Sequence, residues 1–323
     1  MTTETIDVKM STGRVLCTTI FKAGGKKLLS KGHQINDEDV RMLSVEGMDM
    51  VGVTRLDESE VSEDEAVLAV AQEMARGALE IRLAAGGRAN LFATQNCALL
   101  VDEDLLKQIN NAAAIVIATV NNFSYGSKDQ RVATIKSVPF AVDRAQLEAV
   151  VNTIQGRGPI LQARPIERPR VGVIYSDSMQ GNRARQLFSC VVRQRLERLN
   201  VTSCFSIGVT EDVAAVAKGL EQLLASRPTV ILIASTTAPA GPDDVIGMAM
   251  RTIGCTMERF LAPVEPGTLL MLGYKDGIPV ISAPGCFRSA KPNVLDLLLP
   301  PLLSQYPVSG WEVACLGHGG LLS

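Results

Sequence analysis

The sequence predicts an α/β protein whose C-terminal half is a three-layer domain built on a mostly parallel sheet, preceded by smaller α+β domains. Short apolar runs alternate with amphipathic helical segments after residue 170, which is the pattern of parallel strands covered by helices on both faces. Aromatic residues make up only 4% of a chain that is 46% hydrophobic. The cores are therefore expected to be mainly aliphatic.

The N-terminal half has the elements of two small α+β domains. Asn36 precedes a helical run with acidic residues in its first turn, where an asparagine side chain can accept free backbone N–H groups. Pro139 interrupts an apolar run, which favours an edge strand or a bulge. We expect strands at residues 15–20, 27–29, 50–53, 99–101, 113–119 and 132–142, helices at 36–47, 65–81, 102–109 and 143–154, and a loop at 85–90.

The C-terminal half follows the best candidate linker, residues 156–169, which contains glycines and three prolines. Beyond it we expect strands at residues 171–175, 201–207, 229–234, 267–272 and 279–281, and helices at 182–199, 211–226, 243–253 and 293–303. The predicted domains are residues 1–57, 58–165 and 166–305, the last being the α/β domain, with a C-terminal tail at 306–323.

Composition argues against several classes of function. The net charge of −2 does not suggest a nucleic-acid partner. Seven cysteines without a C-x-x-C motif, and only two histidines, suggest neither a disulfide framework nor a multi-histidine metal site. Most of the cysteines are expected to be buried. No segment resembles a signal peptide or a membrane span, so we expect a cytoplasmic protein.

A cluster of arginines lies in the helix predicted at residues 182–199. A solvated helix face is the favoured interpretation, and a partner-docking face or a funnel for an anionic ligand is the alternative. The cluster consists of Arg183, Arg185, Arg193, Arg195 and Arg198.

Three polar segments follow predicted strands of the C-terminal half, where ligands bind in open parallel sheets. The first, residues 176–181, offers small hydroxyls and a glycine before a helix, although a simple helix cap would look the same. The second, residues 235–244, is rich in small residues and ends in Asp243 and Asp244. Two adjacent carboxylates exceed what capping needs and suggest Mg²⁺ binding.

The third segment, residues 283–293, begins with a Pro-Gly turn. Arg288 and Lys291 supply cations suited to phosphate, and Ser289 and Asn293 supply hydrogen bonds. The alternative is an ordinary polar loop. Cys286 is expected to be buried rather than nucleophilic. The chain contains no P-loop, no G-x-G-x-x-G after a strand and no G-x-S-x-G elbow, which weakens kinase, dehydrogenase and hydrolase readings.

Together these segments resemble the molybdopterin-binding domain of molybdenum-cofactor biosynthesis proteins. The resemblance covers residues 170–303 and rests on the strand and aspartate loop at 233–245, the Pro-Gly turn at 266–267 and the segment at 283–287. A closer likeness is to a subgroup linked with molybdenum hydroxylases, in which this domain stands alone or is fused to a cytidylyltransferase-like domain. Its features here are Gly32, residues 88–92, 133–136 and 139–142, the PGC-x-RS-x-K segment at 284–291 and residues 319–322.

The resemblance implies a homodimer that binds molybdopterin or molybdenum cofactor and assists its maturation or its delivery to a molybdenum hydroxylase or that enzyme's maturation proteins. One alternative is a Mg²⁺-dependent transferase resembling molybdopterin molybdenumtransferase, which would act on adenylated molybdopterin by molybdenum insertion or nucleotidyl transfer. The other is a non-catalytic sensor or interaction module. Ser235–Thr236 and Cys286 replace a Gly-Gly pair and an asparagine of the family, which favours binding over catalysis. Nucleotidyltransferase activity is not expected.

The expected roles can be assigned to individual residues. Asp244 and Asp177 are the candidate catalytic groups, and Asp244 is the candidate metal ligand. The expected cofactor-binding residues are Ser176, Asp177, Ser178, Ser235, Thr236, Thr237, Gly241, Asp243, Asp244, Pro284, Gly285, Cys286, Arg288, Ser289 and Lys291.

Overall fold

The computed structural model describes residues 2–84, 86–112, 114–137, 140–239 and 241–322. The predicted strand break at Pro139 lies outside these residues, as do Ala85, Ala113 and Ala240, which fall within predicted loops and strands. The chain divides into two compact units. Unit 1 comprises Met1–Gln95, Leu100–Asn122 and Gly126–Ala163, and unit 2 comprises Asn96–Leu99, Phe123–Tyr125 and Arg164–Ser323.

The beginning of unit 1 is an antiparallel sheet in the order β1-β5-β2 beside helix α1. Asn36 caps α1 as predicted, and the side chain of Asp39 accepts from the Asn36 backbone in return. The predicted strand at 15–20 is instead two short strands that pair with different partners. The elements are β1 (Thr2–Asp7), η1 (Val8–Met10), β2 (Val15–Leu16), β3 (Ile20–Phe21), β4 (Lys27–Leu29), α1 (Asp37–Val45) and β5 (Met50–Arg55).

The rest of unit 1 is organised around a four-stranded antiparallel sheet in the order β11-β13-β9-β8, with α2 packed against three of its strands. The α2 side of this sheet is apolar, with Ala89, Leu91 and Ile135 fully buried. The elements are β6 (Glu60–Ser62), α2 (Glu63–Met74), β7 (Ala75–Gly77), β8 (Leu79–Ala84), β9 (Arg88–Ala93), β10 (Cys97–Val101), α3 (Glu103–Asn110), β11 (Ile115–Thr119), β12 (Ser124–Gly126), β13 (Arg131–Ser137), β14 (Ala141–Asp143), α4 (Arg144–Arg157) and β15 (Leu161–Pro165).

One prediction in this region is wrong, and the predicted linker holds only as the boundary between the two units. The helix expected at 65–81 ends at Met74, because Gly77 adopts a left-handed φ of 85° and a Cβ there would lie 2.1 Å from the Ala163 carbonyl oxygen. The chain then enters β8, where Ile81 pairs with Leu91. The linker expected at 156–169 contains β15, which pairs in parallel with β7. The prolines and glycines of this segment flank a strand and do not form an open linker.

Unit 2 contains the predicted mostly parallel sheet. Among its described residues, six strands lie in the order β17-β16-β18-β21-β20-β19, of which β17, β16, β18 and β21 are mutually parallel. The predicted strands are found, but the one at 267–272 starts later, and β19 was not anticipated. The strands are β16 (Arg170–Asp177), β17 (Ser203–Thr210), β18 (Val230–Ser235), β19 (Thr256–Phe260), β20 (Met271–Lys275) and β21 (Ile278–Ser282).

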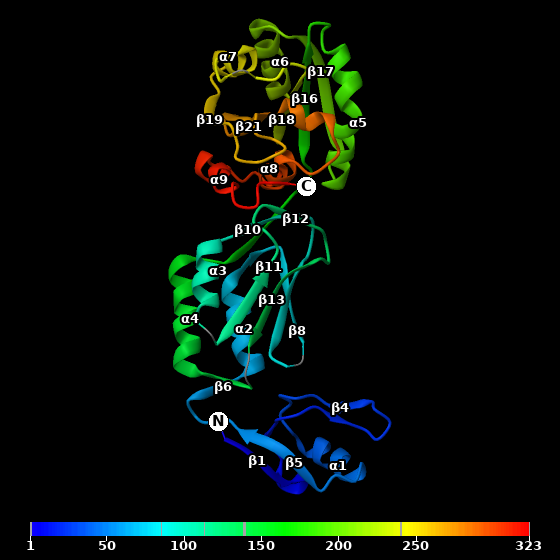
Figure 1. Ribbon diagram of the computed structural model, residues 1–323, viewed down its shortest axis with the longest axis vertical. Coiled ribbons are helices and arrows are strands. Elements are labelled where there is room, and N and C mark those ends of the chain that lie inside the picture. Colours follow the sequence, from blue (N-terminus) through cyan, green and yellow to red (C-terminus); the bar gives the residue numbers. More distant parts are fainter. Residues whose placement is uncertain (1, 85, 113, 138–139, 240, 323) are drawn as a thin grey trace. The chain divides into compact units, whose positions relative to one another are not determined.

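Helices cover both faces of this sheet, which gives the predicted three layers (Figure 1). Helices α6 and α7 pack on one face over Ile174, Ile231 and Ile233, which form an aliphatic core as expected. Helix α5 packs on the other face against β16 and β18. The helices are α5 (Asn182–Arg198), α6 (Val213–Ala225), α7 (Val245–Thr252), the 3-10 helix η2 (Pro284–Arg288), α8 (Val294–Leu303) and α9 (Gly310–Cys315).

Candidate functional site at the carboxyl edge of unit 2

The order of the strands identifies the place where a ligand should bind. From β16 the chain goes to β17 on one side, and from β17 it crosses to β18 on the other side of β16. Open α/β sheets bind ligands at such a switch point, outside the carboxyl ends of the strands. At this point Ser235, the last residue of β18, is the register partner of Ser176, the second-last residue of β16. The first two predicted segments therefore meet at the switch point.

Direct contacts join all three predicted segments. The backbone N–H of Thr236 donates to the Ser176 carbonyl oxygen at 3.2 Å. The Arg288 guanidinium donates to the Thr236 carbonyl oxygen at 3.4 Å. Residues far apart in sequence thus surround one end of the sheet.

Asp177, in the first segment, is engaged by the backbone. Its carboxylate accepts hydrogen bonds from the N–H groups of Met179 (2.5 Å), Gly181 (3.0 Å) and Ala184 (2.6 Å), and the residue is 1% exposed. Burial opposes ionisation, but these hydrogen bonds outweigh it and lower the pKa of Asp177. The carboxylate therefore holds the segment against the start of α5, and Ser178 at its tip is exposed.

Gly181 is required for this turn. It has a left-handed φ of 78°, and a Cβ at this position would lie 2.2 Å from the Tyr175 carbonyl oxygen and 2.6 Å from the Cα of Gly208. Only glycine permits this close approach of backbones without strain. The glycine predicted before the helix thus allows close backbone packing at the carboxyl edge of the sheet.

The second segment is held by a carboxylate that the sequence reading missed. Glu211 follows β17, and its two oxygens accept from the hydroxyls of Ser235 (2.6 Å) and Thr237 (2.9 Å). The sequence signal for Glu211 is its position directly after a strand and before a capped helix, which places it at the carboxyl edge of the sheet. The hydroxyls of Ser235 and Thr237 are therefore oriented by an acid.

The adjacent Asp243 and Asp244 have different partners. Oδ1 of Asp244 caps α7 by accepting from the N–H groups of Ile246 and Gly247, both at 3.1 Å. Asp243 is exposed and pairs with Arg251 at 2.5 Å. Each carboxylate thus has a structural partner, while Oδ2 of Asp244 makes no hydrogen bond to a described residue. Gly241, between the hydroxyls and the aspartates, is half-buried.

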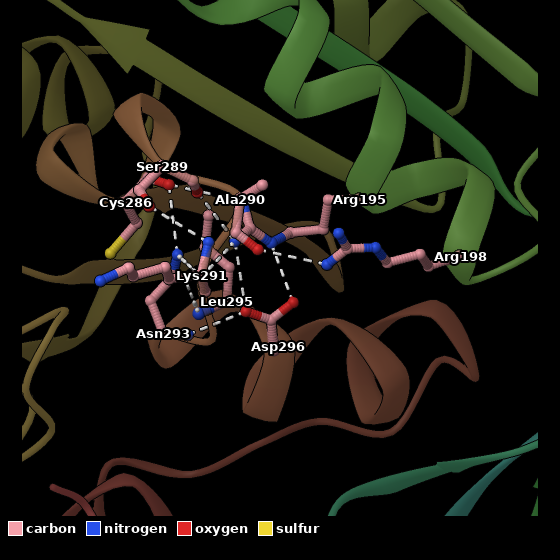
Figure 2. Close-up of polar contacts among 9 residues, drawn as sticks. All are labelled: Arg195, Arg198, Cys286, Ser289, Ala290, Lys291, Asn293, Leu295 and Asp296. Carbon is pink, nitrogen blue, oxygen red and sulfur yellow. Dashed lines mark hydrogen bonds and ion pairs between the residues drawn. The ribbon is translucent and has the colours of Figure 1, made fainter. Parts of the chain in front are cut away.

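The third segment is held in place by a buried arginine (Figure 2). Arg195 of α5 is 3% exposed and pairs with Asp296 at 2.9 Å. Its guanidinium also donates to the carbonyl oxygens of Cys286 (3.4 Å), Ser289 (3.3 Å) and Lys291 (3.2 Å). The interpretation of the arginine cluster as a solvated helix face is wrong for Arg195. Its partners include carbonyl groups of a loop distant in sequence, which helix periodicity alone could not reveal.

Asn293 completes the same network. Its amide donates to the carbonyl oxygens of Cys286 and Lys291, both at 3.2 Å, while its oxygen caps α8. Two side chains thus bond the inward-facing carbonyls of one loop (Figure 2). The loop backbone, including Pro284 and Gly285 in η2, is fixed from the inside.

The cations of the third segment point the other way. Arg288, Ser289 and Lys291 are exposed, and the Ser289 hydroxyl accepts the Lys291 backbone N–H at 3.1 Å. Among the described residues, the Arg288 side chain makes one hydrogen bond, the long one to Thr236. Positive charge is therefore presented beside the switch point.

Cys286 is buried as expected, and burial raises the pKa of its thiol to about 11. A thiol with this pKa is a poor nucleophile at neutral pH. The general expectation for cysteines is wrong, because only Cys97, Cys255 and Cys286 of the seven are buried.

The Ser176 hydroxyl is a buried polar group at the edge without a hydrogen-bond partner in the described part of the chain. Within those described ranges, no group of three or more His, Cys, Asp or Glu residues is arranged to hold a metal ion. No helix in these ranges is long and apolar enough to cross a membrane.

Known proteins similar to this chain are found among solved structures. No protein-family model matches the chain, and no curated protein matches it. Similar solved structures include a molybdenum cofactor biosynthesis protein from Pyrococcus furiosus, with 12% identity, a TM-score of 0.27, and 94% of this chain and 64% of that chain covered.

Two structures of a molybdopterin biosynthesis moeA protein from Pyrococcus horikoshii are also similar. They have 11% and 10% identity and TM-scores of 0.32 and 0.29, and they cover 96% and 94% of this chain and 76% and 74% of theirs. The structural neighbours are thus molybdenum cofactor biosynthesis proteins, and this chain spans less than two thirds of the first of them.

Proposed function

We propose that this protein binds molybdopterin or the finished molybdenum cofactor at the carboxyl edge of unit 2, and assists its maturation or its delivery to a molybdenum hydroxylase. The observation that carries the proposal is the pair of contacts through Thr236, one to Ser176 and one to Arg288. They bring together at one switch point the three segments whose residues resemble the molybdopterin-binding family.

The chemistry of these residues fits a phosphorylated pterin. The phosphate is assigned to Arg288 and Lys291, because charge-assisted hydrogen bonds to phosphate are roughly twice as strong as neutral ones. The Ser289 hydroxyl accepts one hydrogen bond and retains its own hydrogen for donation to the phosphate. The Arg195 and Asn293 network keeps the loop backbone fixed, so that little entropy is lost when the ligand binds.

The polar groups of the second segment are assigned to the pterin ring. A pterin has amino and ring N–H donors, which require acceptors in a partly buried site. Oδ2 of Asp244 is such an acceptor, and it is also where Mg²⁺ would bind. Glu211 positions the Ser235 and Thr237 hydroxyls beside it. Asp177 shapes the first segment, because its oxygens are used by the backbone.

The test is a binding titration with molybdopterin in which the quenching of protein or pterin fluorescence reports the bound fraction. Arg288→Ala should weaken binding by about 1.5–3 kcal/mol, as expected for hydrogen bonds to a charged group. Arg193→Ala is the matched control, because Arg193 is exposed on α5 and makes no side-chain hydrogen bond to a described residue. Its affinity should equal that of the wild type.

The outcomes separate the proposal from its alternatives. Equal affinity of Arg288→Ala and wild type would place the ligand elsewhere. No measurable affinity for molybdopterin would leave a sensor or interaction module. Formation of molybdenum cofactor from adenylated molybdopterin, molybdate and Mg²⁺ would instead identify a transferase.

A further inference from the structure

The four-stranded sheet of unit 1 has one face covered by α2 and a second face that carries polar and charged side chains. On that second face, Arg88 of β9 lies directly opposite Lys136 of β13 in the antiparallel register, and Val116 of β11 lies beside Lys136. Direct cross-strand neighbours have Cβ atoms about 4.5–5.5 Å apart. Two cations from sequence segments more than forty residues apart are thus fixed side by side.

This pair forms no ion pair within the described part of the chain. Arg88 and Lys136 are both exposed, and neither forms a hydrogen bond or an ion pair with another described residue. Arg82, on the same face, bonds Glu80 at 2.6 Å and lies 3.6 Å from Asp129. Like charges directly opposite each other destabilise a sheet. Because the net charge of the chain is −2, the two neighbouring cations do not simply reflect a basic composition.

A buried amide lies next to the pair. Asn90 follows Arg88 by two residues on the same face, which is about 6.6 Å along a strand. It is only 9% exposed, and its Oδ1 accepts from the Thr134 hydroxyl at 2.9 Å. Its amide nitrogen has no hydrogen-bond partner among the residues the structure describes. This nitrogen is not one of the enclosed polar atoms that lack a partner among the described residues, so it is an accessible donor on the open face.

Two acids lie at the same end of the sheet, and one of them, Glu63, attracts Lys136 without an ion pair. Asp64 accepts the Gly87 backbone N–H at 2.9 Å. Glu63 is buried, and burial raises the pKa of its carboxyl, against the opposing effect of Lys31 and Lys136. Neither acid forms an ion pair with Arg88 or Lys136 within the described ranges. The side chains of Arg88 and Lys136 therefore remain free to donate to an anion on the open face.

We propose that Arg88, Lys136 and Asn90 form a second anion site, in unit 1, that binds the phosphate group of a small molecule. A phosphate between the two cations relieves their repulsion and accepts from both. The Asn90 amide supplies a neutral donor beside them. The site is distinct from the carboxyl edge of unit 2 and does not depend on the function proposed there.

Isothermal titration of the full chain with sodium pyrophosphate tests this site. Arg88→Gln and Lys136→Gln should each weaken binding at least tenfold, or about 1.4 kcal/mol. Arg41→Gln, an exposed arginine of α1, is the matched control and should bind like the wild type. The same titrations in an Arg288→Ala background exclude a contribution from unit 2, and the tenfold losses should persist there.

A stability measurement separates binding from a structural role. Without pyrophosphate, Arg88→Gln and Lys136→Gln should melt at or above the wild-type temperature, because repulsion is removed. Asn90→Asp keeps the bond with Thr134 and adds a compensating charge, so it should melt higher still and bind no pyrophosphate.

Three results would overturn the proposal. One is pyrophosphate affinity unchanged in both glutamine variants. Another is melting temperatures lowered in both, which would make the cations structural. The third is binding of a polyanion such as duplex DNA at this face without binding of pyrophosphate, since it would identify a different class of partner.

Discussion

The carboxyl edge of unit 2 and the open sheet face of unit 1 use charge in opposite ways. At the edge, the buried charges of Asp177 and Arg195 are fully engaged by backbone groups and by Asp296. On the sheet face, Arg88 and Lys136 lie side by side and form no ion pair with a residue that the structure describes. The difference shows which charges build the structure and which remain for a ligand: paired buried charges hold loops, and unpaired exposed charges are available to anions.

The largest effect is expected at Arg195. Arg195→Ala removes the ion-pair partner of Asp296 and the donor of the Ser289 carbonyl oxygen. The carbonyl oxygens of Cys286 and Lys291 keep only the Asn293 amide among the described residues. Removing one member of a buried ion pair typically lowers stability by about 3–5 kcal/mol. Urea unfolding measures this loss directly.

The control for this variant is Arg198→Ala on the same helix. Arg198 is exposed, and its side chain donates to one described residue, the Ala290 carbonyl oxygen at 3.2 Å. Arg198→Ala should therefore lower stability by no more than about 0.5 kcal/mol. Similar small losses in both variants would mean that the loop is not held from the inside, and the comparison would fail.

A smaller effect is expected at Asp177. Asp177→Asn keeps the shape but removes the charge that accepts three backbone N–H groups, and should lower stability at pH 7 by about 2 kcal/mol. Because folding lowers the pKa of this carboxyl, its contribution is present above the ordinary aspartate pKa of about 4. It is lost as pH falls through the lowered value of the folded state.

The check is urea unfolding of wild type and Asp177→Asn across the acid range. The difference between them should shrink below about pH 4. A difference that stays constant down to pH 2 would show that the carboxylate charge does not stabilise the segment.

The smallest effect on stability is expected at Asp244, where capping and ligand binding can be separated. Asparagine caps a helix about as well as aspartate, so Asp244→Asn should change the unfolding free energy by only a few tenths of a kcal/mol. The charge facing the proposed ligand is lost, so molybdopterin affinity should fall several-fold. Unchanged affinity would make Asp244 a cap and nothing more.

The fold of unit 2 was predictable because its signals are local. Apolar runs such as 229–234 and capped helices identify a parallel sheet without knowledge of neighbours. In unit 1 the same local signals gave wrong predictions where contacts between distant parts of the chain determine the secondary structure. Gly77 ends a helical pattern only because the Ala163 carbonyl lies against it, and β15 exists only because β7 provides a partner.

The site was predictable at the level of segments but not of individual roles. Turn and hydroxyl residues after strands marked the three loops, which do converge. The roles of Arg195 and Glu211 depend on which loops face them, and no spacing in the sequence encodes that. The pairing of Arg88 with Lys136 likewise appears only once the register of β9 and β13 is known.

The most direct test of the central claim is a crystal structure of the protein grown with molybdopterin. The account predicts a pterin at the ends of β16 and β18, with its phosphate within hydrogen-bond distance of Arg288 and Lys291. A ligand found away from the Ser176, Thr236 and Arg288 contacts, or a carboxyl edge without bound pterin at saturating concentration, would contradict it.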